Sequence, residues 1–260
     1  MSFVSSAPRL TLIPRHTTVA AIGAVAAAAL VSPAVLAGAT SPQLSVAVST
    51  VGEATQTVTS TSGIPGSPGL YTYNGSVSSA TSGEWSVSWA LTGADTAILP
   101  DRPSISTNFT VANTSGSTRS FQILVTFASP VQLTPGVTSI EWGSLLQGTL
   151  TSNQGGVASL VGLVPSMLYG MINGSGVSFN NPSVPSTTTT TTIGPSGNTY
   201  TGAIPGGPNV STIGYMMTFS LSANSTAVFD GSWSGIVVPA PGAAALLALA
   251  GVTGRRRRGR

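Results

Sequence analysis

Few side chains in this 260-residue sequence could carry out chemistry. The chain has no Cys and no Lys, and its single histidine is His16. Thiol nucleophiles, Schiff-base lysines, Cys-ligated zinc and disulfide frameworks are therefore excluded. A serine hydrolase needs a base such as His or Lys beside its nucleophile, and after removal of an N-terminal signal the chain would have neither. The sequence therefore predicts no enzyme of that class.

Carboxylates are the remaining candidates for catalysis or metal binding. Only Asp95 and Asp101 are close in sequence, in a predicted loop at residues 93–102. Two acids across a cleft could hydrolyse a glycan, and the same pair could bind Ca²⁺, which needs six or more oxygen ligands. No motif fixes the ligand spacing, so we favour a solvated loop with Asp101 as a turn residue. We expect a non-enzymatic protein without metal or other cofactor. The six acidic residues of the chain are Glu53, Glu84, Asp95, Asp101, Glu141 and Asp230.

Two tryptophans are the candidates for binding a sugar. Trp85 and Trp89 share one face of a predicted strand at residues 83–91, with Val87 between them. Exposed, they would form a stacking platform for sugar rings; buried, they would belong to the core of a sandwich, which we favour. A run of six threonines at residues 187–192 could present hydroxyls and methyls to a repetitive surface. We interpret it instead as a disordered low-complexity loop.

The elements that must position these residues are predicted to be strands. Apolar residues alternate with polar ones at residues 105–111 and 121–127, separated by a turn-forming segment, which indicates a hairpin. A second pair is predicted at residues 213–221 and 227–233. The body, residues 40–236, is therefore expected to be all-β, an antiparallel β-sandwich. Residues 155–172 have apolar residues at helical spacing, which leaves room for one short helix.

The distribution of charge argues against a nucleic-acid partner. The formal net charge is +3, but seven of the nine arginines lie at the two ends of the chain. Between Gly38 and Gly254, Arg102 and Arg119 face six carboxylates, which gives this body a formal charge of −4. Proteins that bind nucleic acid present clustered Lys and Arg to the phosphates. We therefore expect no nucleic-acid partner.

Residues 1–39 have the organisation of a secretory signal. Arg9 and Arg15 precede an apolar run at residues 19–31, and small residues follow, with Ala37 and Ala39 as candidate cleavage positions. This pattern predicts an N-terminal signal helix that the Sec translocon and signal peptidase handle. The body would then be exported.

Residues 237–260 have the organisation of a second targeting signal. Pro239, Ala240 and Pro241 precede a ten-residue apolar run at residues 243–252, which at about 1.5 Å per residue spans roughly half of the hydrocarbon core of a bilayer. Basic residues next to an apolar helix stay on the cytoplasmic side, so the body is expected outside. The basic cluster that follows the run is Arg255, Arg256, Arg257, Arg258 and Arg260.

This tail, paired with an N-terminal signal, resembles the PEP-CTERM sorting-signal proteins, with Ala240 in place of the acidic residue of the Pro-Glu-Pro motif. A similar tail also ends some ice-binding proteins, which is no evidence of ice binding. The resemblance implies recognition by an exosortase, a membrane-embedded transpeptidase-like enzyme, near Pro239 and Pro241. The short C-terminal hydrophobic helix would then be a transient membrane anchor before release to the cell surface or extracellular matrix, where exopolysaccharide is a further partner. The alternative is a permanent weak tail anchor.

Overall fold

The computed structural model describes residues 41–80, 83–96, 102–131, 137–163, 166–202, 205 and 210–239, with only the backbone described at 129–131, 137–139 and 237–239. The expected signal helix at 1–39, the apolar run at 243–252, the arginine cluster and Asp101 lie outside these residues. No helix that could cross a membrane is found within these ranges.

Most of the described residues lie in strands, and none of them is helical. In chain order the fourteen strands are β1 (Leu44–Thr50), β2 (Gln56–Ser60), β3 (Ile64–Pro65), β4 (Leu70–Ser78), β5 (Trp85–Ala94), β6 (Ser104–Asn113), β7 (Arg119–Val131), β8 (Val137–Ser152), β9 (Leu160–Gly162), β10 (Leu168–Ile172), β11 (Ser175–Asn180), β12 (Thr190–Gly202), β13 (Val210–Leu221) and β14 (Ser225–Pro239).

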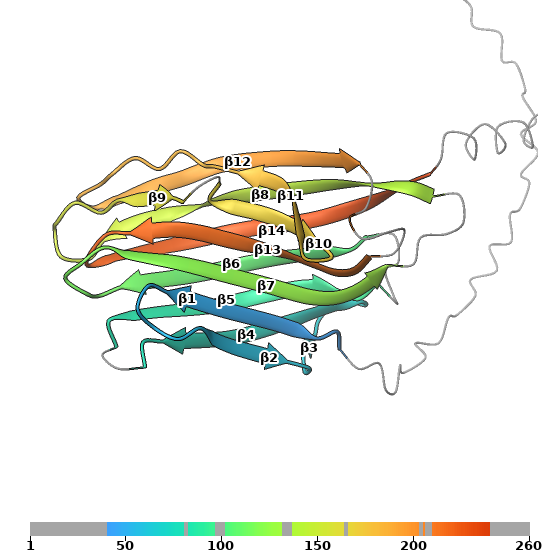
Figure 1. Ribbon diagram of the computed structural model, residues 1–260, viewed down its shortest axis with the longest axis horizontal. Coiled ribbons are helices and arrows are strands. Elements are labelled where there is room, and N and C mark those ends of the chain that lie inside the picture. Colours follow the sequence, from blue (N-terminus) through green and yellow to red (C-terminus); the bar gives the residue numbers. More distant parts are fainter. Residues whose placement is uncertain are drawn as a thin grey trace, which may run out of the picture. The chain divides into compact units, whose positions relative to one another are not determined.

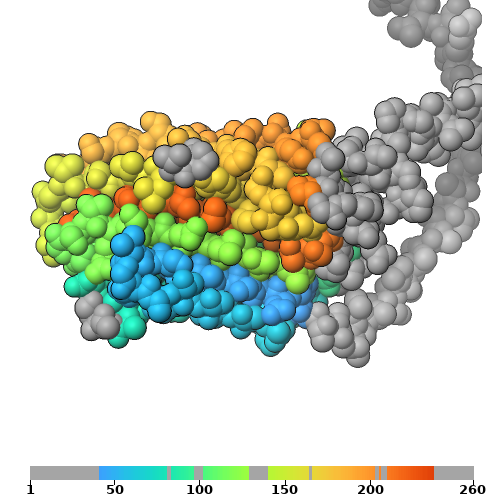
Figure 2. Space-filling view, in the orientation of Figure 1, coloured from blue at the N-terminus to red at the C-terminus, as the bar shows by residue number. Residues whose placement is uncertain are grey.

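Two antiparallel seven-stranded sheets, A and B, make up the fold (Figure 1). Sheet A has the order β11-β10-β13-β7-β1-β2, with β9 also paired to β13. Sheet B has the order β12-β8-β14-β6-β5-β4-β3. In Figure 2 the surfaces of β1 (blue), β7 (green) and β13 (orange-red) lie next to one another on the outer face of sheet A. The expectation of an all-β chain with antiparallel sheets is confirmed.

Aromatic rings from the two sheets pack against each other between them. Phe109 of β6 meets Tyr215 of β13 edge-on, with ring centroids 6.2 Å apart, and Phe219 of β13 lies 5.0 Å from Phe229 of β14. Alternation along the strands places these rings inside: the burial of β5 and β6 switches at nearly every residue. Each such ring buries a large apolar area, so this layer supplies most of the hydrophobic stabilisation.

The predicted strands at residues 105–127 and 213–233 are present, as β6–β7 and β13–β14, but the predicted hairpin is wrong, because in each pair the two strands belong to different sheets. Each strand pair is therefore a connection across the sandwich rather than a hydrogen-bonded hairpin. The turn at residues 114–118 makes the first crossing, and Asn224, with φ of 50°, lies in the second.

Two further sequence-based expectations differ from the structure. Residues 155–172 contain β9 and β10 and no helix among their described residues, because pairing with β13 satisfies their backbone groups. The threonine run is not a disordered loop: Thr190, Thr191 and Thr192 begin β12 and pair with β8. Thr187 forms an isolated bridge with Ala158.

Candidate functional site

The two tryptophans proposed as a sugar platform are core residues. Trp85 is 1% exposed and Trp89 6% exposed. The ring of Trp85 meets Phe121 of sheet A edge-on at 6.1 Å, and Trp89 packs against Phe109 at 6.3 Å. Both indole faces are therefore covered by other side chains, so the stacking interpretation is wrong and the core interpretation is the one the structure supports.

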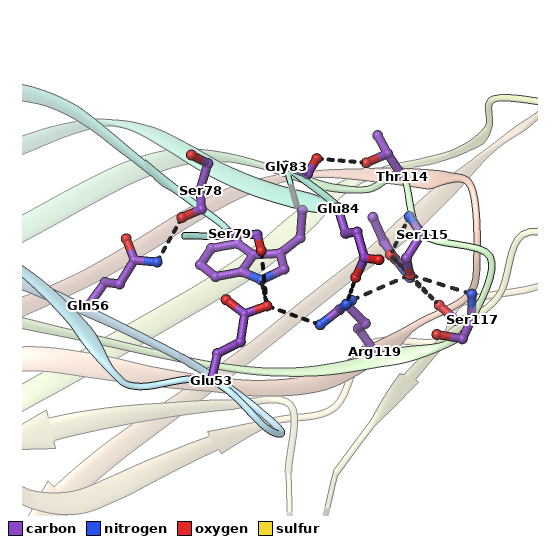
Figure 3. A network of polar contacts seen from close by, with 12 residues as sticks. Glu53, Gln56, Ser78, Ser79, Gly83, Glu84, Thr114, Ser115, Ser117 and Arg119 are labelled. Carbon is purple, nitrogen blue, oxygen red and sulfur yellow. Dashed lines mark hydrogen bonds and ion pairs between the residues drawn. The ribbon is translucent and has the colours of Figure 1, made fainter. Parts of the chain in front are cut away.

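Sequence reasoning missed a polar network at one end of the sandwich, which Figure 3 shows. Glu53 follows β1, Glu84 precedes β5, and Arg119 begins β7. Arg119 Nη1 lies 3.3 Å from Glu53 Oε1, and Nη2 pairs with Glu84 Oε2. The same Glu53 oxygen also accepts hydrogen bonds from Trp85 Nε1 at 2.8 Å and from Ser79 Oγ at 3.1 Å.

This network brings two carboxylates together around one guanidinium. Arg119 is the counter-ion of both Glu53 and Glu84, and the same Glu53 oxygen also holds Trp85 and Ser79. Neither acid lines any of the three surface hollows described below. The arrangement links three segments of the chain that are far apart in the sequence.

The other candidate pair of acids is Asp95 and Asp101, and Asp101 lies outside the described residues. Asp95 is 8% exposed and its backbone N–H donates to the Gly69 carbonyl at 2.7 Å, so the expected solvated loop is wrong at this position. Within the described part of the chain, no group of three or more His, Asp or Glu side chains is placed to hold a metal ion.

The outer face of sheet B carries rows of small polar side chains that cross the strands. One row runs through the hydroxyls of β4, β5, β6, β8 and β12 and is interrupted at β14 by a valine. Because every pair in the sheet is antiparallel and in register here, neighbouring members of a row lie on adjacent strands, about 4.8 Å apart. The members of this row are Ser76, Ser88, Thr110, Val228, Thr149 and Thr192.

Adjacent rows have the same character. The next one contains amides and a carboxylate: Asn74, Ala90, Asn108, Asp230 and Gln147. The one after that is again rich in hydroxyls: Thr72, Thr92, Ser106, Ser232, Leu145 and Gly197. The sheet therefore presents a polar, sparsely charged face to solvent.

Two hollows open on this face along β8, between β12 and β14. The first, of about 430 Å³, is lined by Gln147, Gly148, Thr149, Thr192, Ile193, Gly194, Pro195, Val228 and Asp230. The second, of about 510 Å³, is lined by Gly143, Ser144, Leu145, Gly197, Asn198, Thr199, Ser232 and Ser234. Since both are lined by consecutive stretches of β8 and β14, we describe them together as the β8 groove.

A glycine, which has no side chain, and an irregular strand account for the β8 groove. A Cβ added at Gly143 would meet no atom within 4 Å, so a side chain is simply absent there. The pairing of β12 with β8 shifts register between Ile193 and Ser196, where Gly194 has φ of 70°. Irregularities of this kind bend an edge strand and remove side chains from the row.

One acidic side chain of the β8 groove is held by its neighbour. Asn108 of β6, directly opposite Asp230 in the register, donates from Nδ2 to Asp230 Oδ1 at 2.6 Å. The carboxylate is exposed and lines the first hollow. It is thus an oriented acceptor whose second oxygen makes no hydrogen bond with any described residue.

A third hollow, of about 390 Å³, lies on the outer face of sheet A and is lined by Ser49, Thr50, Val51, Ser120, Phe121, Gln122, Leu163 and Thr218. No ionisable side chain lines it. Its walls come from β1, β7 and β13 and from the residues directly after β1 and β9.

No protein-family model matches the chain, no curated protein matches it, and no solved structure matches it.

Proposed function

We propose that this chain is an exported, non-enzymatic bacterial protein of the cell surface or extracellular matrix, sorted through residues 237–260 by an exosortase-type enzyme. The observation that carries the proposal is the order of three features at the C-terminus: Pro239-Ala240-Pro241, the apolar run at 243–252, and the arginine cluster. Signal peptidase and the Sec translocon would act on residues 1–39.

The place where the last strand ends supports this proposal. Strand β14 ends at Pro239, which pairs with Val137 of β8. Cleavage beyond this residue would therefore leave all fourteen strands intact. The body also satisfies the needs of an exported domain without any disulfide, since its two sheets enclose an aromatic core.

Mass spectrometry of the termini of the exported protein tests the sorting proposal. We expect a mature N-terminus close to Ala39 and the absence of Arg255 to Arg260 from most of the exported protein. A Pro239→Ala, Pro241→Ala variant should keep its tail and remain with the membrane, whereas Pro42→Ala serves as a proline control within the body. Exported wild-type protein that retains the arginine cluster would refute the sorting step.

A second function, that of a carbohydrate-binding or adhesive module in an exopolysaccharide matrix, is favoured by the sparsely charged hydroxyl rows of sheet B. Neutral glycans are recognised through hydroxyl and amide hydrogen bonds, and the outer face of sheet B offers both. A glycan-array screen with the full chain tests it, since binding to no glycan at all would remove this function. The outcome is independent of whether the tail is cleaved.

A further inference from the structure

We propose that the β8 groove binds a single chain of an uncharged polysaccharide. This inference rests on the second proposed function and gives it a site, in place of the buried Trp85 and Trp89. The argument depends on the shape of the β8 groove, on its mixture of polar and apolar side chains, on the orientation of Asp230, and on charge.

The shape fits an extended ligand. The two hollows follow each other along β8 from Gly143 to Thr149, and along β14 from Val228 to Ser234. Six residue steps at about 3.3 Å each give a length of roughly 20 Å. A site of this length accommodates several consecutive units of a linear polymer, whereas a compact metabolite would fill only one hollow.

The lining offers both kinds of surface that a sugar ring needs. Thr149, Ser232 and Ser234 carry hydroxyls that make no intramolecular hydrogen bond with any described residue, so they are available as donors and acceptors. Leu145, 39% exposed, and Pro195 provide apolar surface for the C–H faces of a ring. Binding sites typically combine such apolar walls with a few placed polar groups.

Asp230 is an oriented hydrogen-bond acceptor in the β8 groove. Its Oδ1 is held by Asn108, and its Oδ2 makes no hydrogen bond with the rest of the described protein. A carboxylate oxygen accepts hydrogen bonds from hydroxyl groups more strongly than a neutral acceptor does. Because its partner already orients the side chain, little conformational entropy is lost when a sugar hydroxyl binds.

Charge selects the class of polymer. Asp230 is the one ionisable side chain among the residues that line the two hollows, and no Arg lines either of them. A polyanionic chain would meet a carboxylate with no compensating cation, which disfavours it. An uncharged polyol meets only hydrogen-bonding groups. The expected ligand is therefore neutral, and a uronic-acid polymer should be rejected.

Affinity electrophoresis of the full chain tests this site. The probes are four soluble neutral polymers (barley β-glucan, galactomannan, arabinoxylan and dextran), with alginate as the anionic and glycol chitosan as the cationic polymer. We expect retardation by at least one neutral polymer, and we expect any retardation by alginate, which the terminal arginines attract, to be the same in wild type and in the groove variants below. Retardation by glycol chitosan alone would overturn the proposal, because it would show simple attraction to the acidic body.

Two variants locate the binding. Gly143→Gln places a long uncharged side chain into the second hollow, at a position where a Cβ meets no atom. Asp230→Ala removes the oriented carboxylate and leaves Asn108 in contact with solvent. Each should weaken binding about tenfold or more, the effect expected when a hydrogen bond to a charged group is lost or a site is blocked.

The matched control is Gly116→Gln, in the turn between β6 and β7, where a Cβ also meets no atom within 4 Å. It should bind as wild type does. If a neutral polymer retards all three variants equally, the glycan-binding function stands and the β8 groove is the wrong site. If no neutral polymer retards the wild type, the function and the site both fall. Self-association that only the two groove variants abolish would assign the β8 groove to a second copy of the chain instead.

Discussion

Trp142 and Trp233 stack on each other beneath the β8 groove, with ring centroids 5.0 Å apart and ring planes 17° apart. They come from the neighbouring strands β8 and β14, and both are at most 1% exposed. Trp233 Nε1 donates to the Met171 carbonyl of sheet A at 3.1 Å. A Cβ on Gly170 would lie 2.7 Å from the Trp233 ring, so that strand approaches the indole closely. The stack therefore joins the two sheets directly below the residues that line the second hollow.

Replacing Trp233 with alanine should lower the free energy of unfolding by about 3–5 kcal/mol, because a buried indole is lost and a cavity is left against Gly170. Urea unfolding followed by circular dichroism measures the change. The neighbouring substitution Ser234→Ala removes an exposed hydroxyl and should stay within about 0.5 kcal/mol. A cost below about 1 kcal/mol for Trp233→Ala would mean that the stack does not hold the sheets together.

Glycines of sheet B separate into two classes that substitution can distinguish. At Gly93 an added Cβ would come within 2.4 Å of the ring of Phe127, which is fully buried. Gly93→Ala should therefore cost about 1–3 kcal/mol through overpacking. Gly143→Ala meets no atom and should be neutral or stabilising by up to about 1 kcal/mol, since glycine in a strand costs conformational entropy. Equal thermal stability of the two variants would contradict this distinction.

The alternation of apolar residues was sufficient to predict the all-β body, the core role of Trp85 and Trp89, and the strands around residues 105–127 and 213–233. It failed where tertiary pairing overrides local pattern. The segment at 155–172 has helical spacing, but Leu160 and Leu168 pair with β13 instead. The threonines of β12 have little apolar character, and only their register with β8 makes them a strand.

The β8 groove was not predictable because it depends on register. Asp230 and Asn108 are 122 residues apart, and their contact arises only when β14 pairs with β6. A local signal did exist, since Ser86, Ser88 and Ser106 occupy outward positions of their strands in a regular alternation. That pattern indicates a polar outer face, but neither its hollows nor the orientation of its carboxylate. The network of Glu53, Glu84 and Arg119 escaped prediction for the same reason.

Removing Arg119 should destabilise the sandwich more than removing Glu84. Arg119→Met leaves two carboxylates without a counter-ion, and one oxygen of Glu53 is already buried without a hydrogen-bond partner among the described residues. We expect a loss of about 1–3 kcal/mol in the free energy of unfolding. Glu84→Gln should cost less than about 1 kcal/mol, because that side chain is 42% exposed.

Thermal unfolding at low and high salt measures both variants of the Arg119 network. The wild-type advantage over Glu84→Gln should shrink at high salt, since ions screen an exposed pair. The cost of Arg119→Met should persist. A larger loss for Glu84→Gln than for Arg119→Met would show that Glu53 is not the main partner of the guanidinium.

Tyr215 should make the stability of the protein fall at alkaline pH. Burial raises the pKa of its hydroxyl well above the ordinary value of 10.0. Thr107 acts in the opposite direction on this pKa, but burial has the larger effect, and the Tyr215 hydroxyl meets no partner at hydrogen-bond geometry among the described residues. Above pH of about 10 the unfolded chain releases this proton while the folded chain keeps it, so ionisation favours the unfolded state.

The contribution of Tyr215 is thus complete below pH of about 10 and is lost as the pH rises towards its folded-state pKa, by up to about 1.4 kcal/mol per pH unit. Urea unfolding at pH 9 and pH 11 should show a smaller loss for Tyr215→Phe than for wild type. Burial also raises the pKa of Tyr73, whose hydroxyl donates to the Pro42 carbonyl, so part of the slope should remain until Tyr73→Phe is added. An identical pH dependence in wild type and Tyr215→Phe would mean that solvent reaches this hydroxyl in the folded state.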